Sequence, residues 1–307
     1  MSTTSTTTDP VLPPLEEAVA LVPPPGSITW RRAGDARLMV GAGYALLLQV
    51  SHPVVGAGVS EHSNFREDPW GRLVRTLDYT NVMVYGEPEE AVRMGRWVRG
   101  MHKRIKGVDR HGRRYHALEP EAYAWVHATL ADAIVAGHAR FGRPMSGAET
   151  EGFYAEWRGL GRLLGVRERD LPEDWAGFRA YFDRMVADRL ECTDSVRDVL
   201  EALSRPTRPP VSALPDGAWR AARVPAARLG SLATVGLLPA VLRERFGLRW
   251  TRAQELELRA LGAVSRSATP AMPASLRRMG PAWLARRREA IVRSGMLPEL
   301  ELEPGTA

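Results

Sequence analysis

The 307-residue sequence has a single cysteine, Cys192, and only two lysines, Lys103 and Lys106. One cysteine allows no disulfide within the chain and no cysteine-based metal site, which predicts a protein of a reducing, cytoplasmic compartment. Alternating β-branched runs are scarce, so a sheet-based fold is not expected. A His-Pro pair and several glycines interrupt the most apolar stretch, 41–59, so we expect a buried helix and turn there rather than a transmembrane segment.

The positive charge comes almost entirely from arginine, and the formal net charge is +6. The arginines are scattered along the chain and are not clustered with aromatic residues, as they would be in a nucleic-acid-binding surface. We therefore expect solvated helix faces and no nucleic-acid partner. The best basic amphipathic segment, 281–294, is expected to be a surface helix, with weak contact to a membrane surface as the alternative.

The sequence also lacks the short motifs of several large enzyme classes. It has no G-x-S-x-G, no phosphate-binding loop and no dinucleotide-binding fingerprint, so serine hydrolase, nucleotide hydrolase and NAD-dependent activities have no motif behind them. It has no HExxH and no ExxH pair of the kind that di-iron helical bundles use. All seven histidines lie between residues 52 and 138, which confines any imidazole chemistry to that part of the chain.

Most of the chain has helical periodicity, which predicts an all-α protein. The predicted helices cover residues 33–51, 69–84, 88–106, 120–141, 173–203, 219–229, 231–246, 251–265 and 281–294. Start and stop signals are clearest for 88–106, where Pro88 opens the helix, basic residues fill the last turn and Gly107 follows. Cys192 falls within the long predicted helix 173–203, where inert packing is expected.

The domain organisation is predicted from composition. The Ser/Thr/Pro-rich N-terminus predicts a disordered tail over residues 1–26 that has no features of a secretion signal. One globular helical domain is expected over 27–260, because the segments that follow the Pro-rich connector, 205–217, are too short to bury a separate core. Residues 261–307 are predicted to form a C-terminal helical extension packed on this domain. The sequence does not define the oligomeric state.

One histidine lies where an apolar side chain is expected. On the predicted helix 88–106, His102 shares a stripe with apolar residues at helical spacing. These residues are Ala91, Met94, Val98, Met101 and Ile105. His102 therefore points toward the core. It is either an ordinary core histidine, hydrogen-bonded to a carbonyl group, or a ligand of a bound group.

The preceding predicted helix adds two polar residues to this question. Arg72 and Thr76 are four residues apart and share a helix face, which Tyr79 and Met83 continue while Arg75 flanks it. An arginine and a hydroxyl that face an apolar interior need an anion or a polar ligand. A haem pocket is one such arrangement, because a neutral imidazole binds the iron and an arginine meets a propionate or bound oxygen.

The other histidines have alternative interpretations. His127 shares a face of the predicted helix 120–141 with apolar residues, and it could be core, a hydrogen-bond partner of a ligating residue, or a sixth iron ligand. His52, which precedes Pro53, is expected to cap local backbone. His62, together with Ser63, is a candidate for the distal side of the pocket.

Three stretches carry a family resemblance: "SHPVVGAGVSEHSNFREDPWGRLVRTLDYTNVMVYG", "VRGMHKRIKG" and "YHALEPEAYAWVHATLADA". Together, over roughly residues 28–260, the chain resembles the oxygenase family named for the MpaB protein of mycophenolic acid biosynthesis, to which bacterial rubber oxygenase also belongs. The signature is Arg-x-x-x-Thr followed some thirty residues later by a histidine, which Arg72, Thr76 and His102 match. The resemblance implies an all-helical fold with a globin-like core and a b-type haem whose iron is bound by His102.

The resemblance also implies roles for the surrounding residues. Arg72 would hold a propionate or stabilise bound oxygen, and Thr76 would hydrogen-bond within the pocket. Arg75 takes the place of a lysine on the distal side of the cofactor. Because arginine stays protonated, it is a poor iron ligand, and a closed state with a lysine-ligated iron should not form. The counterpart of the family's distal carboxylate base would be Glu61 or Glu67, of which Glu61 is favoured.

These observations predict a haem b-dependent oxygenase that acts with dioxygen on a small apolar substrate, such as an isoprenoid or another unsaturated compound. The first alternative is a non-catalytic helical protein that binds haem or a hydrophobic ligand. The second is a catalytically silent family member in which Arg72 and Thr76 only complete a buried polar network.

Overall fold

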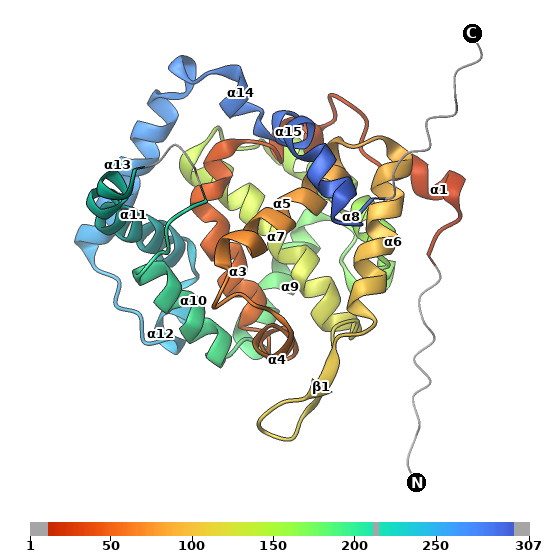
Figure 1. Ribbon diagram of the computed structural model, residues 1–307, viewed down its shortest axis with the longest axis horizontal. Helices are drawn as coiled ribbons and strands as arrows, with labels where there is room; N and C mark the ends of the chain where they lie inside the picture. The colour runs from red at the N-terminus through yellow and green to blue at the C-terminus, as the bar shows by residue number, and fades with distance from the viewer. Residues whose placement is uncertain (1–11, 211–214, 298–307) are drawn as a thin grey trace.

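The computed structural model describes residues 12–210 and 215–297, and within them it is built almost entirely of helices (Figure 1). The α-helices are α1 (Leu15–Ala20), α2 (Ile28–Arg32), α3 (Ala42–Val50), α4 (Pro53–His62), α5 (Pro69–Tyr85), α6 (Pro88–His102), α7 (Pro120–Phe141), α8 (Gly147–Leu164), α9 (Trp175–Asp188), α10 (Asp194–Ser204), α11 (Asp216–Leu237), α12 (Ala240–Arg245), α13 (Arg252–Ser267), α14 (Ala274–Arg277) and α15 (Met279–Arg293). Short 3-10 helices are η1 (Ala36–Gly41), η2 (Glu168–Asp170) and η3 (Thr269–Ala271). The predicted all-α, single-domain fold is confirmed.

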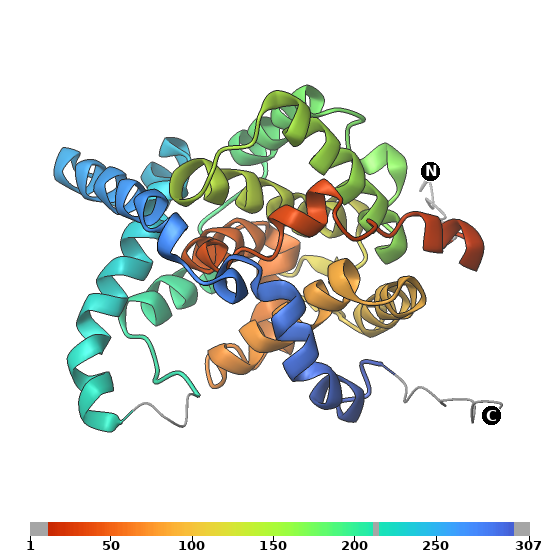
Figure 2. The same ribbon diagram turned by 90° about the horizontal axis from the view of Figure 1, so that it is seen from above.

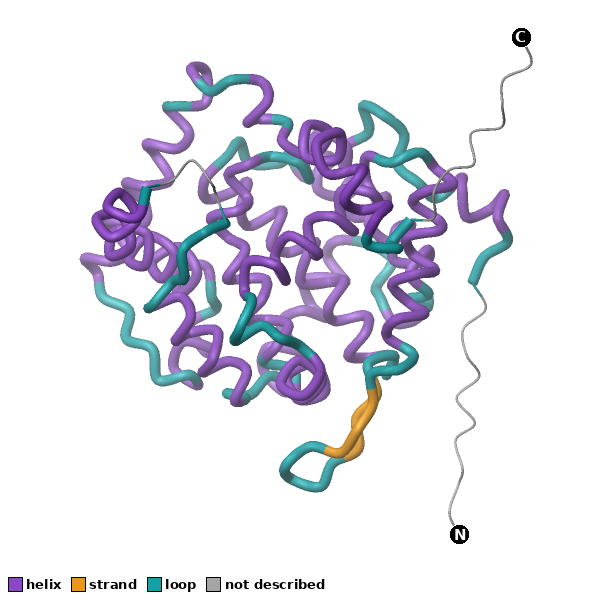
Figure 3. Tube along the Cα trace, viewed as in Figure 1, coloured by secondary structure: helices purple, strands orange, loops and turns teal. Residues whose placement is uncertain are grey.

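The sheet content of the described residues is one small antiparallel hairpin, which projects from the helical body (Figure 3). Its strands are β1 (Lys106–Val108) and β2 (Arg114–His116), and Gly107 pairs with Tyr115. The hairpin corrects the predicted helix 88–106, because α6 ends at His102. The backbone of Ile105 accepts a hydrogen bond from the Ala117 N–H (2.9 Å), so the chain leaves the helix to pair with a later segment.

The predicted disordered tail, 1–26, is too long. Residues 1–11 lie outside the described residues, but residues 15–20 form α1, which packs against α6. Ala18 is buried, and Val22, just after the helix, is also buried in the core. The burial of these apolar side chains stabilises the segment, and this tertiary contact does not show in the local composition.

Proline and capping residues define where the helices around the site begin. Pro53, Pro69, Pro88 and Pro120 each occupy the first turn of α4, α5, α6 and α7, where a missing backbone N–H costs nothing. The α5 start is fixed further by Asp68, whose carboxylate accepts a hydrogen bond from the Gly71 N–H (2.7 Å). These local signals place α5, α6 and α7 close to where the sequence predicted them.

The core is centred on α7 and α3, with α5 and α6 packed beside them (Figure 1 and Figure 2). Trp125 of α7 is fully buried, and its indole N–H donates to the Leu48 carbonyl of α3 (2.8 Å). On the other side, Gly95 of α6 lies so close to α8 that a side-chain carbon there would come within 2.6 Å of the Leu163 carbonyl oxygen. The second contact holds α6, the helix that ends at His102, against α8.

Two other predicted boundaries are wrong. The long helix 173–203 is two helices, α9 and α10, and Cys192 lies in the connection between them. The break is stabilised by tertiary contacts to the end of α3, because the Glu191 N–H donates to the Ser51 carbonyl and the Thr193 hydroxyl donates to the Val50 carbonyl (2.7 Å). The predicted break near residue 230 does not exist, since α11 runs through it.

The C-terminal helix α15 packs across α5, the helix that carries Arg72 (Figure 2). The buried Asp78 of α5 accepts hydrogen bonds from the Trp283 indole (2.9 Å) and from two guanidinium nitrogens of Arg287 (2.8 and 3.2 Å). The buried Glu90 of α6 pairs with Arg288. The predicted domain division itself, 27–260 and 261–307, is not tested by these contacts and stays a prediction.

The Asp78–Arg287 pair is expected to contribute to stability. Replacing Arg287 with alanine leaves a buried carboxylate with only the Trp283 donor, so we expect a loss of about 2–3 kcal/mol, below the full cost for a buried pair because Arg287 is partly exposed. Thermal unfolding followed by circular dichroism should show a midpoint several degrees lower. The matched control is Arg293→Ala on the same helix, whose pairing with Glu289 is exposed. Equal effects of the two substitutions would contradict this role.

No single helix of the described residues is long and apolar enough to cross a membrane. Residues 36–50 and 53–62 reach the required length and composition only as a pair, and the two segments meet at 105°.

Candidate functional site

His102 is the last residue of α6, and its ring orientation is set by its own helix. The Nδ1 atom lies 2.7 Å from the Val98 carbonyl oxygen. Because a carbonyl oxygen can only accept, Nδ1 carries the proton and Nε2 keeps its lone pair. No partner for Nε2 is found in the described part of the chain. Burial, the largest effect, lowers the pKa of His102, and the nearby Arg72 charge lowers it further, whereas the hydrogen bond to Val98 raises it. The lowered pKa favours the neutral ring. This is the form of imidazole that binds a metal through Nε2.

Arg72 lies on α5 close enough to His102 for its charge to affect the pKa of that ring. Its Nη1 donates to the Ser63 hydroxyl (2.7 Å), and its guanidinium carbon lies 5.9 Å from the centre of the Phe65 ring. Burial lowers the pKa of Arg72, although Tyr79 acts in the opposite direction. Within the described residues no carboxylate pairs with this guanidinium. A half-buried arginine with unused donors can bind an anion through charge-assisted hydrogen bonds.

Thr76 follows Arg72 by four residues on the same helix, and its hydroxyl donates to the Arg72 carbonyl (3.0 Å). This is a common way for threonine to satisfy its proton within a helix. The oxygen lone pairs remain able to accept a hydrogen bond. Thr76 can therefore act as an acceptor beside Arg72, but its proton is already used by the backbone.

The structure does not bring Arg75 together with His102. Arg75 is exposed on α5, and its guanidinium contacts Asn64 Oδ1 (3.0 Å) and Asp68 Oδ2 (3.5 Å). Glu67, one of the two candidate bases, is also exposed. The cofactor contact predicted for Arg75 therefore has no support from its position.

Glu61 and His62 meet the hairpin rather than His102. The Tyr115 hydroxyl of β2 donates to Glu61 Oε2 (2.5 Å), and His62 Nε2 lies 3.0 Å from the same hydroxyl. Burial and the Glu61 contact raise the pKa of Tyr115, so its proton stays in place. These contacts attach the hairpin to the end of α4. They do not place either residue next to Arg72.

Two tyrosines join the group, and only one of them was indicated by the sequence. The Tyr123 ring of α7 lies edge-on to His102, with 5.7 Å between ring centres, and its hydroxyl donates to the Leu164 carbonyl (3.0 Å). Tyr79 lies on the same α5 face as Arg72, as its spacing predicted. The effect of the Arg72 charge on the pKa of Tyr79 agrees with that spacing, but the contact of His102 on α6 with Tyr123 on α7 is tertiary and has no local signal.

Tyr79, Arg72 and His102 lie deep in the protein but are only half-covered. Burial raises the pKa of Tyr79 to about 12 and shifts the pKa values of the other two away from their charged forms. All three nevertheless keep accessible surface. The Arg72 charge acts on the pKa values of both His102 and Tyr79, and we call the partly exposed area that these three side chains share the His102 recess.

His127, the other candidate ligand, is held in the core of α7. Its Nε2 lies 2.8 Å from the Trp157 carbonyl oxygen, its ring stacks on the Trp157 ring (5.2 Å between centres), and the Trp157 indole donates to the His127 carbonyl (3.1 Å). These are the contacts of a satisfied core histidine. His52 was expected to cap local backbone, which is wrong. Its ring makes no capping bond and instead faces Glu121 of α7 (3.3 Å).

Burial of His127 should make stability depend on pH. Burial lowers the pKa of His127 to about 4, with only the Trp157 carbonyl acting against it. The folded protein disfavours the protonated ring. The neutral His127 therefore contributes fully to stability above about pH 6.5, and this contribution is lost progressively as the pH falls toward 4. The unfolding midpoint of His127→Gln should therefore fall less than that of the wild type when the pH is lowered from about 7 to about 5. Parallel losses in the two proteins would contradict this effect.

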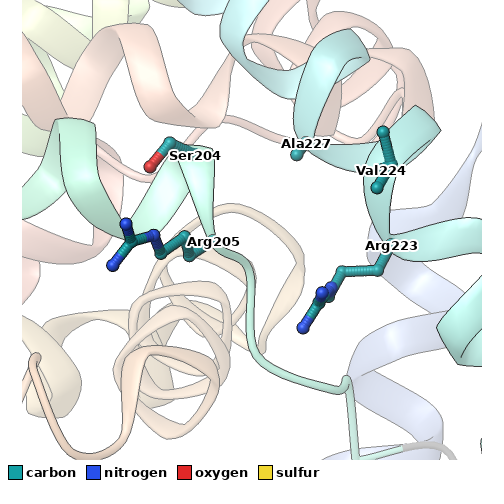
Figure 4. Close-up of a pocket in the computed structure, with 5 residues that line it drawn as sticks. All are labelled: Ser204, Arg205, Arg223, Val224 and Ala227. Atoms are coloured by element: carbon teal, nitrogen blue, oxygen red, sulfur yellow. The ribbon is translucent and has the colours of Figure 1, made fainter.

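A separate hollow of about 380 Å³ lies between the end of α10 and α11 (Figure 4). Its lining residues are Ser204, Arg205, Arg223, Val224 and Ala227. None of the predicted site residues is among them. Over the described residues, no three His, Cys, Asp or Glu side chains gather in a way that could hold a metal ion.

The comparison with known proteins identifies the class to which this fold and site belong. The family model described as "ER-bound oxygenase mpaB/B'/Rubber oxygenase, catalytic domain" matches residues 30–267. This match runs from within α2 to the end of α13 and includes every predicted site residue. The protein therefore contains an oxygenase-type catalytic domain, and the chain belongs to the MpaB and rubber oxygenase family. No curated protein and no solved structure matched the chain.

Proposed function

We propose that the protein is a haem b-dependent oxygenase in which Nε2 of His102 binds the iron. The observation that carries this proposal is the state of His102. Its Nδ1 proton is used by the Val98 carbonyl, and no partner for its Nε2 lone pair is found among the described residues. Haem iron needs only one or two protein ligands, so a single histidine is sufficient. Family membership supports the oxygenase part of the proposal.

The residues around His102 suit a haem. The porphyrin is apolar with two anionic propionates, and the half-buried Arg72 has no carboxylate partner among the described residues. Met94 and Val98 of α6 and Met83 of α5 belong to the hydrophobic core, which supplies apolar surroundings for the porphyrin. The proposed set is therefore His102 for the iron, Arg72 for a propionate or a bound oxygen ligand, and Thr76 as an acceptor beside Arg72.

When bound, haem would supply the activation of dioxygen for insertion into an apolar, unsaturated substrate. The residues of this chain prepare the site. Val98 fixes the His102 tautomer, Tyr123 limits the rotation of the ring through its edge-on contact, and Ser63 orients the Arg72 guanidinium. Partial burial of Arg72 makes its charge act more strongly on a bound ligand than the charge of a fully exposed arginine would.

The leading alternative is a non-catalytic protein that holds haem or a hydrophobic ligand in the same recess. A silent family member, in which Arg72 and Thr76 only satisfy each other, is less well supported. The Thr76 hydroxyl donates to a backbone carbonyl, and the Arg72 guanidinium donates to Ser63 and not to Thr76. The single cysteine supports a cytoplasmic location, which stays a prediction.

The deciding experiment is the visible spectrum of the protein purified from haem-replete cells, followed by oxygen-uptake measurements with an alkene. A Soret band together with alkene-dependent oxygen consumption supports the proposal. A Soret band without oxygen consumption across a panel of alkenes supports the binding protein. A folded protein that remains colourless after incubation with haemin rules out both haem proposals.

A further inference from the structure

The hydroxyl of Tyr79 stands out among the tyrosines of the protein. Tyr79 follows Arg72 by seven residues and Thr76 by three, so all three lie on one face of α5. Its electrostatic neighbours are Arg72, which acts on the pKa of Tyr79, and Tyr123, whose pKa Tyr79 affects in turn. Tyr123 in turn contacts the His102 ring, so Tyr79 has Arg72 as one neighbour and a residue that contacts His102 as the other.

The Tyr79 hydroxyl has no hydrogen-bond partner in the described structure, whereas most other tyrosines have one. Those with a partner are Tyr44, Tyr85, Tyr115, Tyr123 and Tyr154. Tyr181 also lacks a partner, but its oxygen is sealed inside the protein. The Tyr79 oxygen is not among the sealed, unpaired atoms, so it reaches the accessible surface of the recess.

The Tyr79 hydroxyl is partly accessible and has no acceptor among the described residues, so a ligand that supplies an acceptor can take its hydrogen bond in place of water. Burial raises the pKa of Tyr79 to about 12, so near neutral pH the phenol keeps its proton and can donate it. Arg72 offers further donors from the same helix face. Two donors on one wall favour a ligand that carries negative charge or an exposed oxygen.

We propose that Tyr79 is a ligand-binding residue whose hydroxyl, together with the Arg72 guanidinium, donates a hydrogen bond to an anionic or oxygen-bearing ligand in the His102 recess. This proposal rests on the proposed function and deepens it. According to this proposal, Arg72 and Tyr79 of α5, and not His102 alone, determine which small ligands bind. The residue was not assigned a role by the Arg-x-x-x-Thr signature.

The test uses fluoride and imidazole as probes on the full chain loaded with ferric haem. Fluoride is a strong hydrogen-bond acceptor, whereas imidazole bound to iron presents no acceptor and reports only access. For Tyr79→Phe we expect about tenfold weaker fluoride binding, the usual worth of a hydrogen bond to a charged acceptor. Imidazole binding should be unchanged. Absorbance titrations measure both affinities.

The matched control is Tyr181→Phe, which removes another unpaired hydroxyl, but one sealed in α9 away from the recess. It should leave both affinities unchanged. Thermal unfolding gives a second measurement, because Tyr79→Phe removes no internal hydrogen bond and should not lower the midpoint. An unchanged fluoride affinity in a Tyr79→Phe protein that still holds haem overturns this proposal alone. Failure of the wild type to take up haem overturns the proposed function, and this proposal with it.

Discussion

Replacing His102 with alanine is expected to give a folded protein that retains little haem. Removing even a hydrogen-bond partner of a metal ligand typically costs about 10- to 100-fold in affinity, so loss of the ligand itself should cost at least as much. The haem content of the purified variant, measured as the ratio of Soret to protein absorbance, is the readout. A change in stability alone would not be informative, because truncation of any buried histidine leaves a cavity.

Free imidazole gives a second readout for the same variant. The substitution opens a space of side-chain size at the proposed iron ligand, and added imidazole is expected to occupy it and restore part of the spectrum. The control is His127→Ala, which removes a buried histidine that already has a carbonyl partner and should keep most of its haem. The reverse pattern would make His127 the ligand, and unchanged haem content in both variants would remove the cofactor from the proposal.

Replacing Arg72 with alanine is expected to have the second largest effect. The guanidinium is half-buried and has no carboxylate partner in the described structure, so an anionic group of the ligand would gain a charge-assisted hydrogen bond worth about 1.5–3 kcal/mol. Haem affinity should therefore fall by about ten- to a hundredfold in titrations of the apoprotein with haemin. Arg72→Lys should recover only part of this loss, because lysine keeps the charge but not the planar fork.

The matched control for Arg72 lies one turn away on the same helix. Arg75 is exposed and contacts Asn64 and Asp68, so Arg75→Ala should leave haem affinity close to that of the wild type. Both variants lose one positive charge from the same helix, and they differ only in the direction in which the removed side chain pointed. Similar small losses at the two positions would remove Arg72 from the site. A larger loss at Arg75 would favour the distal role that its place in the family signature implied.

The sequence predicted the helices of the site well where local chemistry fixes their ends. Pro69, Pro88 and Pro120 begin α5, α6 and α7, and Gly142 follows the last residue of α7. The helix α8 was not among the predicted ones, although the capping box of Ser146 and Glu149 was a usable signal. Within one helix, spacing also orders the side chains, which is why Arg72, Thr76 and Tyr79 could be placed on a common face.

Other features depended on contacts between segments far apart in the chain. After α6 the chain hydrogen-bonds to Ala117, just beyond the hairpin, and the connection between α9 and α10 hydrogen-bonds to the end of α3. Neither contact leaves a local pattern. The same holds for the C-terminal helix, whose Trp283 and Arg287 meet Asp78 more than two hundred residues earlier.

The sequence by itself therefore determined the all-helical class, the starts of the helices that carry the site, and the family signature of Arg72, Thr76 and His102. Only the tertiary structure decided which nitrogen of His102 is free, that Arg72 has no carboxylate partner in the described chain, that Arg75 turns to the surface, and that Tyr79 and Tyr123 flank the recess. The physical reason is range. Helix starts and helix faces depend on residues within about one turn, whereas burial, tautomer and ion pairing depend on which distant helices pack together.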